Sequence, residues 1–453
     1  MYAVKSYNNL YEKMLDEANL RGAFFDAAFR KTTRKDIKRI LDNLDFHVEH
    51  LRDVLLNTAA GKDGAEVNEK VFAPVKRKGQ SIFQTSNNKV RVIRKPGYQY
   101  EQVVHHAVMR VIMPIFRRGM YEYCCGSVPG RGPHYGKKYI ESIRRKDIKR
   151  MKYCAVLDIK QFYASISQDA LKDMLRKKIR DRRMLHLLFL IIESCDDGIP
   201  LGYYTSQWFA NFYLQGLDHH IKETLKVKYY IRYLDDLVLF GNNKKELHKA
   251  VREIIRYVSE ELRLTIKENW QVFRFDYIKE FEISCDDREP LADLWRTLKE
   301  QKIKREYRKR NGAPVIVVDR MAFNKHRETI LPDGHGFNVE EIHYGRALDF
   351  MGFVFYCDRT VIRERILLRA TRKIRKVKKK GRITWLDASA ILSYIGWFSH
   401  TDSYGAYLKH VKPYVKVQDL KRCVSRRARR LNKDAKRKLA VSRRHSNKKA
   451  NGG

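Results

Sequence analysis

The chain has 453 residues, of which 43% are hydrophobic, so it exceeds one ordinary domain and can bury sizeable cores. Its 94 lysines and arginines against 53 acidic residues give a formal net charge of +41, which favours a nucleic-acid partner over an anionic membrane surface and leaves a ribosomal protein as a further alternative. Seven cysteines without a CxxC pair support neither a zinc ribbon nor a disulfide framework, and we expect reduced thiols, no signal peptide and no bilayer-spanning stretch.

The first third of the chain is predicted to begin with helices. Apolar residues at helical spacing over Tyr7–Asn57 predict two or three amphipathic helices. The next expected elements are, in chain order, a loop at Thr58–Asn68, strands at Ser81–Gln84 and Val90–Arg94 joined by a turn at Asn87-Asn88, a helix from about Tyr100 to Arg117, and a Gly-rich interruption at Gly126–Gly136.

The middle of the chain alternates between strand and helix patterns. In chain order we expect a buried strand at Tyr153–Ile159, a helix at Ser167–Lys178 capped by Ser167, a helix at Tyr204–Lys226 entered through Gly198–Gly202, a hairpin of Tyr229–Arg232 and Leu237–Phe240, a helix at Lys244–Leu262 and a short strand at Leu264–Ile266.

The last third is more charged. The segment from Phe273 to about Gly345, with its basic run at Lys302–Arg310, is predicted to be an insertion or a separate subdomain. The remaining expected elements are a strand at Leu348–Tyr356, a basic helix at Arg365–Lys380, helices at Asp387–Phe398 and Tyr404–Tyr414, and a flexible tail after Lys421 that binds nucleic acid.

Three acidic residues form the pattern most indicative of chemistry. Asp235 and Asp236 stand at the tip of the predicted hairpin, where adjacent carboxylates are unfavourable unless they are solvated or bind a cation. Asp158 ends the predicted strand before it. Taken alone, Asp235 and Asp236 fit an ordinary Asp-rich turn, and Asp158 fits a turn or cap residue. Together they suit two Mg²⁺ ions, with Mn²⁺ as a substitute, that activate a primer 3′-hydroxyl and stabilise leaving pyrophosphate; Asp236 would be the weaker or outer ligand.

Around these acids the sequence resembles a bacterial reverse transcriptase. The order and approximate spacing of the motifs agree with that family, over Ser81–Gly241 and, less closely, through the primer grip to the thumb. The motifs are Arg91-Val92-Ile93, Val103–Phe116, Asp158–Tyr163, Gly198–Gly202 with Thr205-Ser206-Gln207 and Ala210-Asn211, Tyr233–Asp236, Leu264–Lys267 with Asn269, and Asp349–Phe353. The resemblance implies an α+β right-hand polymerase with fingers, a palm with an antiparallel sheet, and a helical thumb.

The resemblance also implies roles for individual residues. The catalytic residues would be Asp158, Asp235 and Asp236, and the metal ligands would be these three and Ile159. The residues that bind the dNTP would be Arg91, Tyr163, Gly202 and Gln207. The primer grip would consist of Phe350, Met351 and Gly352. The Tyr163 ring would clash with a ribose 2′-hydroxyl, and the alternative role for this residue is ordinary core packing. For Gln207, the alternative to nucleotide binding is an amide on the helix surface. Gly126–Gly136 fits template contact and, nearly as well, a structural loop. His105-His106 are expected to pack rather than to bind metal.

The predicted domain organisation follows from the motif order. It comprises an N-terminal helical region at 1–59, fingers at 60–152, palm at 153–273, a charged insertion at 274–347, a primer grip completing the palm at 348–357, a helical thumb at 358–415 and a basic tail at 416–453.

The sequence resembles more than one subclass of reverse transcriptase. Leu201–Gln207, Val103–His106 and Tyr229–Asp236 resemble diversity-generating retroelement enzymes. The Gly-rich segment, the insertion and the basic tail depart from them and favour enzymes related to anti-phage defence, which typically copy a dedicated noncoding RNA encoded beside them. An intron or retron enzyme is a third alternative, and the lack of an endonuclease or zinc-finger pattern counts against an intron protein.

The expected partners are an RNA template, in this interpretation a dedicated noncoding RNA, a DNA or RNA primer, and dNTPs. We expect a cytoplasmic protein, bacterial or phage-encoded, without a membrane partner, and leave a protein partner or homo-oligomer open. Two rival functions stay open as well. Intact acids argue against a catalytically silent RNA-binding scaffold, because unused acids would weaken RNA binding, and Tyr163 argues against an RNA-synthesising polymerase.

Overall fold

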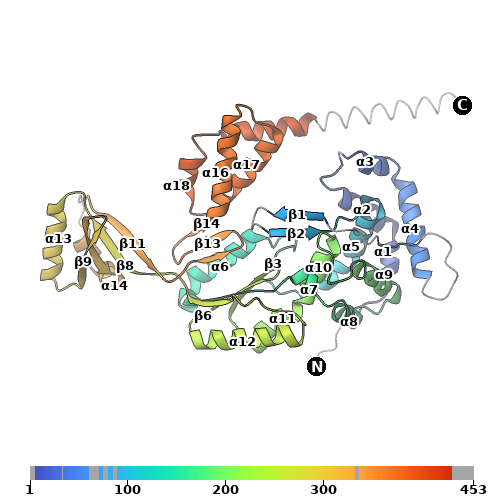
Figure 1. Cartoon of the computed structure of the whole chain (residues 1–453), viewed down its shortest axis with the longest axis horizontal. Helices are drawn as coiled ribbons and strands as arrows, with labels where there is room; N and C mark the ends of the chain where they lie inside the picture. Colours follow the sequence, from blue (N-terminus) through green and yellow to red (C-terminus); the bar gives the residue numbers. More distant parts are fainter. Residues whose placement is uncertain are drawn as a thin grey trace. The chain divides into compact units, whose positions relative to one another are not determined.

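The computed structural model divides the chain into two compact units, Met1–Phe273 and Arg274–Gly453 (Figure 1). The structure describes residues 6–32, 34–60, 71–74, 80–84, 89–331 and 336–430. Each unit is considered by itself below. Within this described part of the chain, no helix combines the length and the hydrophobicity that a membrane crossing requires.

The first unit begins with four helices where two or three were predicted. They are α1 Leu10–Leu15, α2 Glu17–Ala28, α3 Lys35–Asp42 and α4 Leu44–Ala60. Asp16 separates α1 from α2 because it leaves the helical conformation and its carboxylate accepts a hydrogen bond from the Asn19 N–H at 3.1 Å. α4 includes Thr58, which was expected in a loop. Its hydroxyl donates a hydrogen bond to the Val54 carbonyl at 2.6 Å, so the polar group of Thr58 has a partner within the helix. Residues 59 and 60 of that expected loop also belong to α4, and its remainder, 61–68, lies outside the described residues.

A strand pair and a long helix follow, as predicted. β1 Gln80–Gln84 and β2 Lys89–Ile93 are antiparallel, and the turn expected at Asn87-Asn88 lies outside the described residues. A π-helical turn, η1 Tyr98–Gln102, leads into α5 Val103–Arg118. His105 in α5 is buried against Thr205, whose hydroxyl lies 3.0 Å from its Nδ1, and burial lowers the pKa of His105 to about 3. This histidine therefore packs as a neutral ring, as predicted.

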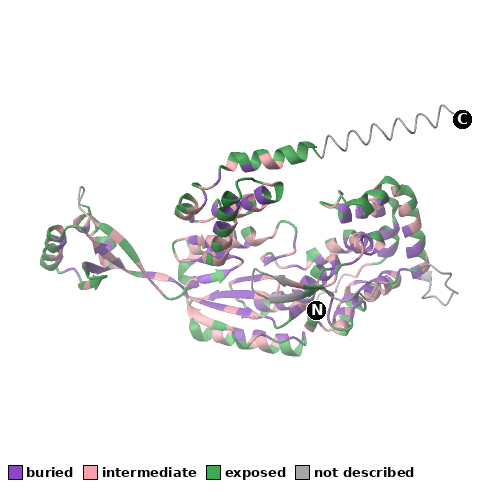
Figure 2. Cartoon of the chain, turned by 45° about the horizontal axis from the view of Figure 1, so that its top comes forward, coloured by how far each residue is buried: buried purple, intermediate pink, exposed green. Residues whose placement is uncertain are grey.

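A five-stranded sheet forms the centre of the first unit, and Figure 2 shows its strands as largely buried. In spatial order its strands are β3 Cys124–Cys125, β5 Tyr229–Tyr233, β6 Asp236–Gly241, β4 Tyr153–Asp158 and β7 Gln271–Arg274. β4, β5 and β6 pair antiparallel, as the predicted hairpin requires, whereas β3 adds in parallel to β5. Leu237, Val238 and Leu239 of β6 are all fully buried, so both faces of this strand are covered.

Helices surround this sheet. Those after the strand pair are α6 Pro133–Asp147, the 3₁₀ turn η2 Ile148–Met151, α7 Phe162–Ser165, α8 Gln168–Lys178, α9 Arg182–Ile192, α10 Tyr204–Tyr213, α11 Gln215–His219, the π-helical η3 His220–Thr224 and α12 Lys244–Glu260. Ser167 caps α8, as predicted, with its hydroxyl 3.3 Å from the Ala170 N–H. α12 packs against β4 and β6.

Two predictions for this unit are wrong in detail. The helix expected over Tyr204–Lys226 is divided into α10, α11 and η3, because Leu214 leaves helical geometry and the Gln215 amide turns to donate to the Phe116 carbonyl at 2.6 Å. The strand expected at Leu264–Ile266 is a single bridge between Ile266 and Ile159.

The predicted insertion folds around a hydrophobic core of its own in the second unit. A four-stranded antiparallel sheet has the order β11-β8-β10-β9. The elements are β8 Tyr277–Ser284, α13 Arg288–Glu300, β9 Arg305–Arg310, β10 Ala313–Asp319, α14 Arg320–Lys325, α15 Arg327–Ile330 and β11 Asn338–Tyr344. Strand β9 thus contains residues 305–310 of the predicted basic run, and residues 302–304 precede it. Ile283, Leu298, Ile316 and Val318 are fully buried in this core.

The second unit continues with a small sheet and a helical cluster. The elements are β12 Leu348–Phe350, β13 Phe353–Phe355, β14 Thr360–Ile362, α16 Glu364–Lys379, α17 Trp385–Phe398 and α18 Tyr404–His410. The flexible tail expected after Lys421 is wrong up to residue 430. Residues 417–430 are helical, because Leu420 is buried with Val411 and Val415 in the core of this cluster. Residues 431–453 of the predicted tail lie outside the described residues. The seven predicted domain ranges stay predictions.

Candidate active site

The three predicted catalytic acids meet at the ends of neighbouring strands. Asp158, the last residue of β4, is the direct partner of Asp236, the first residue of β6. Asp235 lies in the two-residue turn between β5 and β6, and its carbonyl accepts a hydrogen bond from the Ile159 N–H at 3.3 Å. Leu234, before it, adopts φ +56°, a left-handed conformation that tight hairpin turns require. The hairpin thus brings together acids that stand 77 residues apart in the sequence.

The two carboxylate oxygens of Asp158 have different surroundings. Oδ2 pairs with the Lys267 ammonium, and the Lys267 N–H donates to the Asp158 carbonyl at 2.8 Å. Oδ1 is buried and has no hydrogen-bond partner within the described part of the chain. A buried carboxylate oxygen without a donor is costly, and a cation would satisfy it. Oxygen donors of this kind are those that Mg²⁺ prefers, so the acids fit the ions that the sequence led us to expect.

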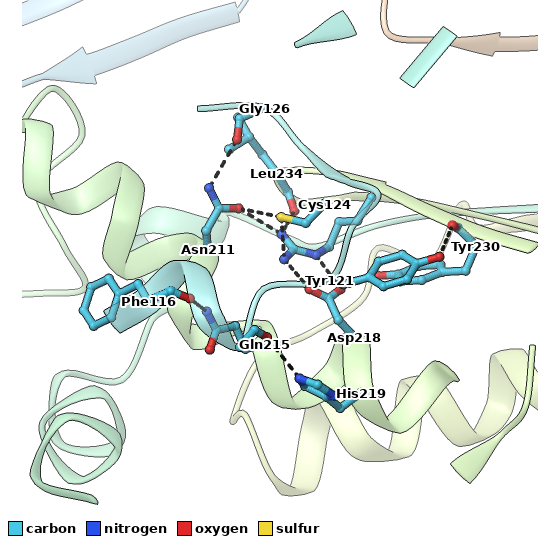
Figure 3. Close-up of polar contacts among 12 residues, drawn as sticks. Phe116, Tyr121, Cys124, Gly126, Asn211, Gln215, Asp218, His219, Tyr230 and Leu234 are labelled. Atoms are coloured by element: carbon cyan, nitrogen blue, oxygen red, sulfur yellow. Dashed lines mark hydrogen bonds and ion pairs between the residues drawn. The ribbon is translucent and has the colours of Figure 1, made fainter. Parts of the chain in front are cut away.

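A buried ion pair supports the turn that carries Asp235 (Figure 3). Arg232 in β5 and Asp218 in α11 are both fully buried, with Nη2–Oδ2 at 2.6 Å and Nε–Oδ1 at 2.8 Å. The Arg232 Nη1 also donates to the Leu234 carbonyl at 2.9 Å. Burial disfavours the charged guanidinium, but Asp218, Cys124 and Tyr230 together outweigh this effect and raise the pKa of Arg232 well above its ordinary value. Arg232 therefore stays charged and fixes the backbone directly before Asp235.

Further polar contacts join this pair to neighbouring elements. Asn211 of α10 accepts a hydrogen bond from Arg232 at 3.2 Å and donates one to the Gly126 carbonyl at 3.2 Å. Figure 3 shows Asn211 turned toward Gly126. The Tyr230 hydroxyl donates to Asp218 at 2.9 Å. Gly126 opens the Gly-rich segment, so that segment packs against the hairpin and has a structural role. The sequence predictions missed Arg232 and Asp218; the signal was an arginine inside an apolar strand.

The predicted gate residue Tyr163 lies in α7, directly after the Asp158 strand end. Its backbone carbonyl accepts a hydrogen bond from the Ile199 N–H at 2.9 Å. Gly198 makes this approach feasible, because a Cβ there would lie 2.2 Å from the Tyr163 carbonyl oxygen. The Tyr163 ring is partly buried and meets Phe162 edge-on at 5.6 Å between centroids.

The other predicted nucleotide-binding residues lie on two elements that touch. Gly202 adopts φ +115°, and a Cβ there would lie 2.4 Å from the Arg94 carbonyl oxygen. The Arg94 N–H donates to the Leu201 carbonyl at 2.8 Å, which ties the end of β2 to the turn before α10. Arg91 lies on β2, opposite Ile82 of β1. Gln207 is an exposed residue of α10. Gly202 thus positions the strand that carries Arg91.

The predicted primer-grip residues belong to the second unit. Phe350 ends β12, and Met351 and Gly352 form a tight turn into β13 with φ +54° and +89°. A Cβ at Gly352 would lie 2.8 Å from the Trp397 ring, so only glycine fits between this turn and α17.

The sequence matches a known protein family over its central part. Residues 87–276 match the model of the family described as reverse transcriptase (RNA-dependent DNA polymerase). This part of the chain is similar to reverse transcriptases. The match confirms the predicted fold class, an α+β right-hand polymerase. The activity of the matched family agrees with the predicted enzyme class, an RNA-directed DNA polymerase of the nucleotidyltransferase type.

Solved structures of telomerase give distant matches. Apo telomerase from Candida tropicalis, truncated from its C-terminal domain, is 15% identical with a TM-score of 0.32, and the alignment covers 41% of this chain and 48% of that one. Telomerase from the same yeast with a fragment of telomeric RNA is 13% identical, with a TM-score of 0.34 and coverages of 44% and 41%. The Candida albicans telomerase is 14% identical, with a TM-score of 0.31 and coverages of 41% and 40%. Structural similarity this distant says nothing about the activity of this chain. No curated protein sequence matches the chain significantly.

Proposed function

We propose that the chain is an RNA-directed DNA polymerase whose catalytic residues are Asp158, Asp235 and Asp236. The observation that carries this proposal is the meeting of the three acids at adjacent strand ends, with a buried Asp158 oxygen that has no donor among the described residues. Asp158, Asp235 and the Ile159 backbone would hold two Mg²⁺ ions, with Asp236 as the outer ligand. These ions would supply charge stabilisation at the attacking hydroxyl and at the leaving pyrophosphate.

The chain's own residues would orient and neutralise the substrates. Arg91 suits the triphosphate, because a guanidinium fork matches phosphate oxygens. Tyr163 would exclude a ribose 2′-hydroxyl, and Gly202 and Gln207 would border the nucleotide. Lys267 offsets the charge of Asp158.

The second unit would hold the nucleic acid. Phe350, Met351 and Gly352 would contact the end of a DNA or RNA primer, and the strained turn that Trp397 and Gly352 enforce would keep them in place. Helix α16 carries a dense set of lysines and arginines that suits a phosphate backbone.

We further propose that the template is a dedicated noncoding RNA and that the system is an anti-phage defence system of a bacterium or phage, acting in the cytoplasm. The folded insertion and the net charge of +41 support this reading, since both add surface beyond a minimal polymerase. A diversity-generating retroelement enzyme is the alternative. A protein partner or homo-oligomer is compatible with either.

The experiment is purification of the full-length chain from its native operon, sequencing of the co-purified nucleic acid, and addition of dNTPs with Mg²⁺. We expect one discrete RNA that becomes cDNA. Asp235→Asn should lower synthesis by roughly 10³-fold, because removing a group that stabilises developing charge costs several kcal/mol, and should leave RNA binding intact or slightly stronger. The exposed Asp286→Asn serves as a charge-matched control.

Three outcomes would count against parts of this proposal. Heterogeneous bound RNA with active synthesis would contradict the dedicated template. Bound RNA without synthesis in the unsubstituted chain would favour the RNA-binding scaffold. Loss of RNA binding in Asp235→Asn would mean that the acid is structural.

A further inference from the structure

Four side chains of the types that can bind a metal ion, from three separate segments, meet in the second unit. Asp276 precedes β8, His343 lies in β11, and Cys357 and Asp358 lie between β13 and β14. One donor atom from each lies within 4.8 Å of the donors of the other three. These acids are distinct from Asp158, Asp235 and Asp236.

Backbone structure fixes the positions of these side chains. The Asp276 N–H donates to the Arg346 carbonyl at 3.0 Å, and the Cys357 N–H donates to Asp276 Oδ2 at 2.8 Å. A β-bulge at Ile342/His343 interrupts the pairing of β11 with β8, and bulges of this kind redirect side chains. The His343 Nδ1 lies 2.9 Å from Asp276 Oδ2. The donors thus converge without long, flexible side chains.

The donor types indicate which ion would bind. A thiolate and an imidazole favour Zn²⁺ over Mg²⁺, which takes oxygen ligands, and Zn²⁺ accepts carboxylates beside them. Asp276 is only 4% exposed, as is usual for a structural site rather than for solvated acids.

The charge of the cluster is also suitable. Two carboxylates and a thiolate exceed the charge of one Zn²⁺ by a single negative charge, and Arg359 supplies the compensating positive charge. Its Nη1 lies 2.7 Å from Asp358 Oδ2, which leaves Oδ1 of the same carboxylate 3.9 Å from His343 Nε2. Arg359 also lies 3.1 Å from His343 Nε2, a contact that an ion bound to this nitrogen would replace.

We propose that Asp276, His343, Cys357 and Asp358 form a structural zinc site that joins the insertion sheet to the turn after β13. The competing interpretation is a hydrogen-bonded His343–Asp276 pair that never holds metal. In that case Cys357 stays a thiol, because burial, together with Asp276, raises its pKa to about 12. The proposal does not depend on polymerase activity.

The test is the zinc content of the full-length protein, purified without chelator and dialysed against limiting Zn²⁺, measured by mass spectrometry. We expect one bound zinc ion per chain, lost in Cys357→Ser and in His343→Gln. Cys285→Ser removes a thiol of the same unit that lies outside the cluster, and it should keep the zinc. Absence of zinc from the unsubstituted protein, or its full retention in Cys357→Ser, would overturn the proposal.

A second measurement keeps the test decisive if the variants fold poorly. Replacing Zn²⁺ by Co²⁺ in the unsubstituted protein should give thiolate-to-cobalt charge-transfer absorption, and removal of the ion by a chelator should lower the unfolding temperature by several degrees. Saturating Co²⁺ without a thiolate band, or a chelator without effect on unfolding, would overturn the site even if no variant could be purified.

Discussion

Asp158 presents two different oxygens at the end of β4, and this difference defines the candidate site at the scale of single residues. Oδ2 pairs with Lys267, which comes from a segment 109 residues later, and Oδ1 is buried without a donor in the described structure. The sequence motifs located both residues but did not predict their pairing, because motif order carries no information on which side chains touch.

Tyr163 gives a residue-scale prediction about sugar selection. Tyr163→Ala should lower the preference for dNTPs over NTPs by roughly 10- to 100-fold, the range that a single steric contact in a pocket supplies. The backbone contact from Ile199 to the Tyr163 carbonyl does not depend on the ring, so the local fold should persist. The measurement is the ratio of kcat/KM for a dNTP and its matching NTP. Tyr163→Phe is the control that keeps the ring, and an unchanged ratio in Tyr163→Ala would exclude the gate.

Gly202 gives a second residue-scale prediction. Gly202→Ala should lower the free energy of unfolding by roughly 1–3 kcal/mol, because φ +115° is strained for alanine, and its Cβ would press on the Arg94 carbonyl. If this contact positions Arg91, KM for the dNTP should rise as well. Gly132→Ala is the matched control, because φ is −89° there and nothing lies within 4 Å of the added Cβ. Reduced stability with an unchanged KM would make Gly202 purely structural.

At the scale of elements, the β5–β6 hairpin depends on the Arg232–Asp218 pair. Either Arg232→Met or Asp218→Leu alone should cost about 3–5 kcal/mol of stability, because it leaves a buried charge unpaired, and the double substitution should recover much of that loss. The double variant still lacks the donor to the Leu234 carbonyl. We therefore expect it to fold but to synthesise DNA more slowly.

Urea unfolding and single-turnover synthesis separate these two effects. The control is Tyr230→Phe, which removes one hydrogen bond to Asp218 and leaves the ion pair intact. Full activity in the stable double variant would show that Arg232 does not position Asp235.

The elements themselves were predicted with uneven success. Strands β4, β5 and β6 followed from their apolar runs, since a buried strand needs β-forming residues throughout. The helix expected over Tyr204–Lys226 is divided, and the tail expected after Lys421 is helical to residue 430. In both cases a tertiary contact determines the local structure. The Gln215 amide donates to the Phe116 carbonyl where the helix is divided, and Leu420 is buried in a hydrophobic core where the tail was expected.

At the scale of the whole molecule, the net charge predicts salt-sensitive RNA binding. Replacing Arg372, Arg375, Lys376 and Lys379 of α16 by glutamine should reduce the slope of log affinity against log salt by roughly 1–3, since each phosphate contact to a single strand contributes about 0.7. All four side chains are exposed. The measurement is a binding titration at several salt concentrations.

A control with the same charge change distinguishes a specific surface from general attraction. Lys244, Lys245, Lys249 and Arg252 are exposed on α12, and their replacement by glutamine removes an equal charge. Equal loss of affinity and slope in both sets would mean that net charge alone governs binding and that α16 has no special role.

The sequence by itself determined the central strands, most helices, the positions of the acids and the similarity to reverse transcriptases, because these depend on local periodicity and on motifs with a fixed order. Only the tertiary structure decided which side chains meet across long separations: Lys267 with Asp158, Arg232 with Asp218, and Asp276 with His343 and Cys357. Such pairings depend on how strands and turns bring distant segments together, and a linear pattern does not specify that geometry. The Asp158 oxygen that has no donor among the described residues likewise follows from burial, which is a property of the folded chain.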